Sequence, residues 1–124
     1  RKFEPISPTH PGFVHILHVG ELEDVFFYIM ELADDLETGQ KINPSNYQPK
    51  TLHRVRLSPL DCVSFGITMA DALSALHAQT LLHRDIKPSN IVYCGGKPKL
   101  ADIGLVTDAG GMPLEGVEVT RQFV

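Results

Sequence analysis

Four polar side chains near the middle of the chain are of the types that transfer of a phosphoryl group requires. Asp85, Lys87 and Asn90 lie close together in the sequence, and Asp102 follows a short distance later. Phosphoryl transfer depends mostly on aiming the nucleophile, so we interpret Asp85 as the catalytic base that orients a hydroxyl group. Lys87 is expected to neutralise charge on the transferring group. Asn90 and Asp102 carry hard oxygen atoms, which suit Mg²⁺.

A predicted β-hairpin gives Asn90 and Asp102 a way to share a metal ion. The segments 91–93 and 98–101 are predicted to be short strands, and the connection at 94–97 contains two adjacent glycines, which is typical of a tight turn. A hairpin brings its outer ends together, and paired strands lie about 4.7–4.9 Å apart. The two side chains are therefore expected to lie close to one another.

The same residues belong to motifs that resemble those of the eukaryotic-type protein kinase family, of the serine/threonine type. The segment His-Arg-Asp-Ile-Lys-Pro-Ser-Asn at 83–90 resembles its catalytic loop, and Asp-Ile-Gly at 102–104 resembles its metal-binding Asp-Phe-Gly turn. In this family, lysine two residues after the catalytic aspartate accompanies serine/threonine specificity. The resemblance implies a kinase that uses ATP and Mg²⁺ to phosphorylate Ser or Thr hydroxyls of a protein substrate.

The resemblance covers nearly the whole chain and implies an α+β, two-lobed, protein-kinase-like fold that is incomplete. We expect residues 1–30 to form the end of the small lobe with its rear strands, residues 31–37 the hinge, and residues 38–124 the start of the large lobe through the activation loop. The family's Gly-rich loop, strand lysine and helix glutamate would precede residue 10, and its Ala-Pro-Glu motif would follow Val124. The chain is interpreted as a kinase-domain fragment, inactive in isolation.

On the same alignment the adenine of ATP would lie against the hinge. Met30 corresponds to the gatekeeper, the carbonyl of Glu31 and the N–H of Ala33 to the adenine partners, and Val92 to the floor of the pocket. One of three acidic residues just beyond Ala33 would reach the ribose hydroxyls, and Glu37 is assigned to the nucleotide site for this reason. The three acidic residues are Asp34, Asp35 and Glu37. The alternative interpretation of each is a residue in a solvated acidic turn.

The resemblance also bears on the activation loop. Arg84 is the residue that often pairs with a loop phosphate in this family, and Thr120 is a better placed acceptor than Thr107. Ile103 departs from the family's phenylalanine, and an aliphatic side chain packs differently from an aromatic one. We expect His83 to pack against Ile103.

The elements upstream of the motifs are predicted to be a strand pair and a long loop. Alternation over 13–19 and a β-branched and aromatic run over 25–30 predict two strands joined by a turn at 20–24. Residues 38–57 are predicted to form a polar surface loop, longer than the usual connection of about 4–6 residues. Its basic residues at 50–56 are interpreted as solvated, with contact to an acidic partner as the alternative.

A helix is predicted to follow and to support the catalytic loop. Ser58 is a typical N-cap, Pro59 suits the first helical position, and Asp61 suits the third. Apolar positions then recur at three- and four-residue steps over about 20 residues, which predicts an amphipathic helix with one buried face. The predicted buried stripe is Leu60, Val63, Ile67, Ala70, Leu73 and His77.

The composition is consistent with one modest hydrophobic core, but it does not indicate a particular function. The 124 residues are 43% hydrophobic with a formal net charge of −4, which gives no electrostatic argument for nucleic acid. Cys62 and Cys94 lack metal-type spacing and fit reduced thiols. The apolar stretch 63–82 contains several polar residues, so no membrane segment is predicted here. A cytoplasmic location is expected, and a tether outside this segment stays open.

Two alternatives to an active protein kinase are also open. A pseudokinase would bind nucleotide or partners without transfer, and the sequence preceding this chain would discriminate it by lacking the Gly-rich loop and the strand lysine. A small-molecule phosphotransferase of related fold usually lacks an arginine at position 84 and the Lys87-Pro88 pair, which disfavours it.

Overall fold

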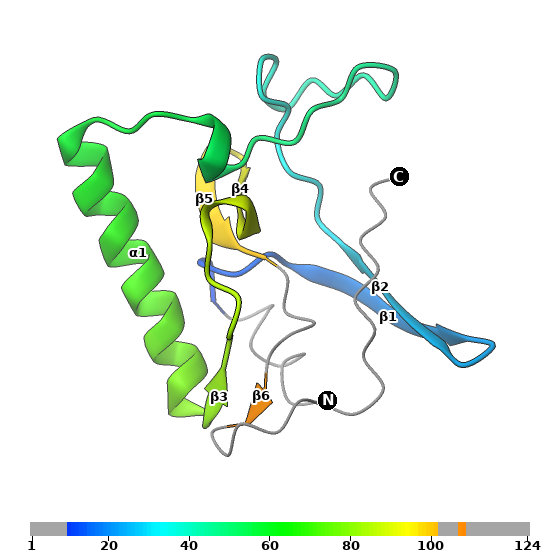
Figure 1. Cartoon of the computed structure of the whole chain (residues 1–124). Coiled ribbons are helices and arrows are strands. Elements are labelled where there is room, and N and C mark those ends of the chain that lie inside the picture. The colour runs from blue at the N-terminus through cyan, green and yellow to red at the C-terminus, as the bar shows by residue number, and fades with distance from the viewer. Residues whose placement is uncertain (1–9, 102–106, 109–124) are drawn as a thin grey trace.

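The computed structural model describes residues 10–101 and 107–108 (Figure 1). Its strands pair as three antiparallel two-stranded sheets, β1–β2, β3–β6 and β4–β5. The predictions for Asp102, Ile103 and Thr120 lie outside the described residues. In chain order the elements, with the 3₁₀ helices written η, are β1 (Ile16–Leu22), β2 (Val25–Met30), η1 (Leu52–Arg54), α1 (Pro59–Ala78), β3 (Leu81–Leu82), η2 (Pro88–Asn90), β4 (Ile91–Cys94), β5 (Lys97–Leu100) and β6 (Thr107–Asp108).

The predicted strand pair is present as the β1–β2 hairpin, but the first strand begins and ends later than predicted. Its turn consists of Glu23 and Asp24, both with positive φ (48° and 67°), as a two-residue hairpin turn of type I′ requires. Positions 13 and 14 are not part of β1 because they lie beside β5 instead. There the Val14 N–H donates to the Leu100 carbonyl at 3.1 Å.

The long helix α1 begins where the sequence predicts it. Pro59 is its first residue, and Ser58 has an extended backbone with a hydroxyl oxygen that accepts from the Asp61 N–H at 3.1 Å. That bond satisfies one of the donors that every helix leaves unpaired at its N-terminus. Among the described residues, no helix has both the length and the apolar character that crossing a bilayer requires.

The predicted buried stripe of α1 was wrong. Leu60, Val63 and Ile67 are exposed, and Leu73 is only partly buried. The helix is apolar on more than one side, so three- and four-residue spacing alone fits several stripes. The side that packs inward carries Met69, Ala72 and Leu76.

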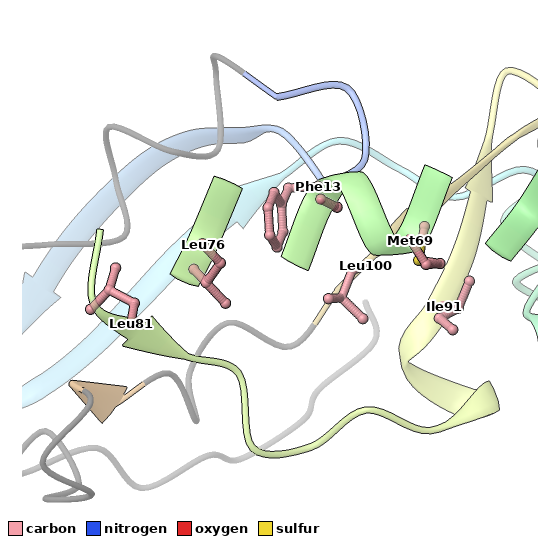
Figure 2. Packing of buried hydrophobic residues seen from close by; sticks show 7 residues of the cluster. Phe13, Met69, Leu76, Leu81, Ile91 and Leu100 are labelled. Carbon is pink, nitrogen blue, oxygen red and sulfur yellow. The ribbon is translucent and has the colours of Figure 1, made fainter. Parts of the chain in front are cut away.

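The main core lies between α1 and the β4–β5 hairpin (Figures 1 and 2). Apolar side chains meet there from five segments: the stretch before β1, α1, β3, β4 and β5. Because β3 and β4 flank residues 83–90, this core fixes both ends of the loop that carries the catalytic motif. Its buried members are Phe13, Met69, Ala72, Leu76, Leu81, Ile91 and Leu100.

The predicted hairpin at 91–101 is confirmed as β4 and β5. Its turn is Gly95-Gly96, with φ of 59° and 78°, the left-handed region that glycine enters without strain. The other edge of β4 is covered by the loop that follows the hinge. Thr51 pairs with Val92, and the Tyr93 N–H donates to the Lys50 carbonyl at 2.9 Å.

Candidate active site

The structure brings Asp85, Lys87 and Asn90 together. The Asn90 amide nitrogen donates to the Asp85 carboxylate oxygen Oδ2 at 2.7 Å and to the Asp85 carbonyl at 2.8 Å. Lys87 Nζ lies 3.6 Å from the other carboxylate oxygen, Oδ1. The Asp85 side chain is 22% exposed and that of Lys87 is 46% exposed. The carboxylate is therefore held in one orientation while it stays accessible to a hydroxyl group from outside.

His83 supports this loop from the interior. Its ring is 1% exposed, and Nε2 lies 2.8 Å from the Ala101 carbonyl while Nδ1 accepts from the Asp85 N–H at 3.1 Å. A carbonyl only accepts and an amide N–H only donates, so these partners require a neutral imidazole with its proton on Nε2. Arg84 lies between the two bonded residues with φ of 69°, a conformation that a non-glycine residue keeps only where its surroundings impose it.

The outer ends of the hairpin lie together, as predicted, and their hydrogen bonding extends to Ala101, where the first described range ends. The Ala101 N–H donates to the Asn90 carbonyl at 2.8 Å, and Asp102 follows directly outside the described residues. Because the Asn90 amide nitrogen faces Asp85, its amide oxygen is the atom left for a metal. An amide oxygen from Asn90 and a carboxylate from Asp102 would together form a donor set that fits Mg²⁺.

A second buried cluster gathers the residues assigned to the adenine pocket. Ala33 and Val92 are both buried in it, and Met30 packs against it. Cys94 belongs to the same cluster, and burial, reinforced by the nearby Glu31, raises the pKa of its thiol to about 11, so it forms part of an apolar wall. Among the described residues, no group donates to the Glu31 carbonyl and none accepts from the Ala33 N–H.

The Glu31 side chain anchors the hinge instead of facing solvent. Its oxygen Oε1 accepts from Lys99 Nζ at 2.6 Å and from the His15 N–H at 2.9 Å. The Glu31 N–H donates in turn to the His15 carbonyl at 2.9 Å. These bonds join the hinge to β5 and to the segment before β1.

Both predicted roles for Asp34 and Asp35 were wrong, since neither residue is solvated and neither is available for a ribose. Asp34 is 7% exposed and accepts from the Gly95 N–H at 2.9 Å and the Gly96 N–H at 2.8 Å. Asp35 is 6% exposed and its carboxylate is likewise occupied by backbone groups. Glu37 is exposed, so its carboxylate stays the candidate for the ribose.

The carboxylate of Asp35 organises the loop that follows the hinge. It accepts from the backbone N–H groups of Gln48 at 3.0 Å, Glu37 at 2.9 Å and Thr38 at 3.0 Å. These donors stabilise the charged form and lower the pKa of Asp35 to about 2, with the Gln48 N–H having the largest effect. A short polar segment after an aspartate is a signal for such a turn, which the sequence interpretation missed.

The predicted surface loop at 38–57 is ordered by contacts that the sequence did not reveal. The Tyr47 hydroxyl donates to the Ala33 carbonyl at 2.7 Å, and Lys50 lies 5.0 Å above the centre of the Tyr93 ring. Arg54 donates to the Gln48 side chain at 2.9 Å and is exposed. Part of the basic run is thus solvated, as predicted, whereas Lys50 covers an aromatic face.

Comparisons with known proteins point to one family. A family model described as "Protein kinase domain" matches residues 4–124. "Serine/threonine-protein kinase PknK" of Mycobacterium tuberculosis is 45% identical over 109 residues, which cover 82% of this chain and 9% of that protein. "Serine/threonine-protein kinase PrkC" of Bacillus subtilis is 28% identical over 102 residues, which cover 82% of this chain and 14% of that protein.

A solved structure shows the same fold. The kinase PK-1 of Cydia pomonella granulovirus superposes with a TM-score of 0.66 at 21% sequence identity, covering 86% of this chain and 38% of that one. The α+β arrangement described above is thus the corresponding part of a kinase fold. The chain spans less than a fifth of the length of the two curated relatives named above.

Proposed function

Because the chain belongs to the protein kinase family, we propose that the protein is an active serine/threonine kinase, which transfers the γ-phosphoryl group of ATP to a Ser or Thr hydroxyl of a protein substrate. The observation that carries the proposal is the Asp85 carboxylate, which Asn90 orients at 2.7 Å and which is accessible from outside. Lysine at position 87 supports Ser/Thr rather than Tyr as the acceptor. Both relatives named above are called serine/threonine kinases.

In this proposal each member of the catalytic loop has one task. Asp85 accepts a hydrogen bond from the acceptor hydroxyl, aims its oxygen at the γ-phosphorus and takes the proton as the new bond forms. Lys87 stabilises charge on the transferring group. Asn90 holds the Asp85 carboxylate through its nitrogen and offers its amide oxygen to the metal.

The nucleotide and its metal are held by residues from two sides of the site. Met30, Glu31, Ala33 and Val92 would form the adenine pocket, Glu37 would contact the ribose, and Asn90 with Asp102 would bind Mg²⁺. When bound, the ion supplies positive charge that neutralises the phosphate oxygens. A protein that works on cellular proteins with ATP suits a cytoplasmic location.

The test is a transfer assay with the full-length protein, Mg-ATP and a generic basic protein substrate. We expect Asp85→Asn to lower kcat by roughly 10²–10⁴-fold, the range for loss of a general base, with the affinity for ATP unchanged. Asp24→Asn is the matched control, because it makes the same chemical change in an exposed turn where positive φ favours asparagine.

Equal activity of Asp85→Asn and the control would contradict the proposal. Nucleotide binding by the wild type without any transfer would favour the pseudokinase alternative instead.

A further inference from the structure

Asp34 is bonded through all four of its polar atoms. Its N–H donates to the Tyr93 carbonyl at 2.7 Å, and its carbonyl accepts from the Lys50 N–H at 2.8 Å. Its two carboxylate oxygens take one N–H each from the glycines of the β4–β5 turn, at 2.9 and 2.8 Å. One buried residue therefore joins the hinge, the loop after it and the far end of the β4–β5 hairpin.

The turn is shaped to receive a carboxylate. Gly95 and Gly96 both have positive φ, and consecutive backbone N–H groups in such a turn can form a concave site for an anion. The two oxygens of Asp34 each satisfy one of these N–H groups. Asparagine would offer one acceptor, and its NH₂ group would face the other donor.

The position of Asp34 matters because it directly follows Ala33. The Ala33 N–H and the Val92 side chain would contact the edge and the face of the same adenine, yet they belong to segments far apart in the sequence. Both residues pack in one apolar cluster, but apolar contacts are non-directional and allow small sliding movements. The hydrogen bonds of Asp34 are directional, so they can fix the position of the hinge relative to the pocket floor at Val92.

We propose that Asp34 is a positioning residue for the nucleotide: by holding the Gly95-Gly96 turn and the Tyr93 carbonyl, it fixes the Ala33 N–H relative to Val92. The proposal rests on the proposed function and adds to it a residue that itself touches no part of the substrate. It acts on nucleotide binding and not on the chemical step, because Asp85, Lys87 and Asn90 lie at the opposite end of the hairpin from the glycine turn.

The test uses Asp34→Asn in the full-length protein, with Asp24→Asn as the matched control. We expect the dissociation constant for Mg-ATP to rise about tenfold, the order that follows loss of a hydrogen bond to a charged group, while kcat stays within about twofold. In the nucleotide-free protein, the Gly95 and Gly96 amides should exchange hydrogen faster in Asp34→Asn than in the control. Asp34→Glu, which keeps both oxygens, should restore most of the affinity, and it decides the matter if Asp34→Asn does not fold.

An affinity for Mg-ATP equal to that of the control, or a loss of kcat as large as the loss of affinity, would overturn the positioning role. Unchanged hydrogen exchange at the Gly95 and Gly96 amides would show that Asp34 does not hold this turn. If one of these results is found while the wild-type protein still transfers phosphate, only the positioning role is refuted and the proposed function is retained. A wild type that binds no Mg-ATP would instead refute the proposed function, and the positioning role with it.

Discussion

Asn90 shows how a single buried side chain can define the orientation of a neighbouring carboxylate. It is 3% exposed, and its amide nitrogen reaches both the side chain and the carbonyl of Asp85. Two bonds from one nitrogen to one residue fix which way the amide faces, and with it where the amide oxygen points. Asp34 and Asp35 are further examples, since their carboxylates accept backbone N–H groups that order the hinge and the loop after it.

At the residue scale, we predict that Asp35 makes the free energy of unfolding depend on pH in the acidic range. Its folded pKa of about 2 lies below the ordinary value of 3.8, so the unfolded chain binds the proton first as pH falls. The stabilisation is complete above about pH 4 and is lost as pH falls through about 2. Denaturant unfolding of wild type and Asp35→Asn should therefore differ at pH 5, with the difference shrinking toward pH 2.

A difference that stays constant over this range would show that the three backbone N–H groups do not stabilise the ionised carboxylate. Asp24→Asn serves as the control, since that side chain is exposed.

At the scale of elements, α1 and the β4–β5 hairpin are each defined by a short signal at one end. The helix begins with a hydroxyl cap followed by proline, and the hairpin turns on two glycines that adopt positive φ. Both signals act between neighbours in the sequence, so neither depends on a tertiary contact. Between them, these two elements and their core hold residues 83–90 at both ends.

We predict that Ser58→Ala lowers the free energy of unfolding by about 1 kcal/mol, because the Asp61 N–H loses its hydroxyl acceptor. Ser74→Ala is the matched control in the same helix, since Ser74 is exposed and alanine is the better helix former. Urea unfolding followed by circular dichroism measures both changes. Equal stability of the two variants would contradict a capping role for Ser58.

At the scale of the whole molecule, one core couples the helix to the strands that carry the site. Leu76 and Leu100 are both 1% exposed, and Leu100 also bonds the segment before β1 through its backbone. Interiors are close-packed, so removing atoms from this core is expected to disturb the packing of neighbouring segments, including residues 83–90. The apolar side of α1 that carries Leu60 takes no part in it.

We predict that Leu76→Ala lowers the free energy of unfolding by about 2–5 kcal/mol, from lost burial and the cavity that remains. Leu60→Ala, at a side chain that is 79% exposed, should change it by less than about 0.5 kcal/mol. Thermal unfolding of both variants provides the comparison. A larger effect at Leu60 than at Leu76 would place the core on the other side of the helix.

The sequence by itself determined the features that depend on near neighbours. It located the kinase-like motif at 83–90, the cap and length of α1, the glycine turn of the hairpin and the approach of the hairpin's outer ends. Each of these follows from residues a few positions apart, whose backbone preferences and side-chain chemistry are local. The kinase resemblance rested on the same short motifs.

Only the tertiary structure decided which side of α1 is buried, that Phe13 and Val14 lie beside β5, and which groups Asp34 bonds. Apolar residues occupy more than one side of α1, so the choice belongs to the elements that pack against it. The partners of the Asp34 carboxylate are two glycines about sixty residues away. No local sequence pattern predicts such a bond, because it forms only when the folded chain brings the hinge and the glycine turn together.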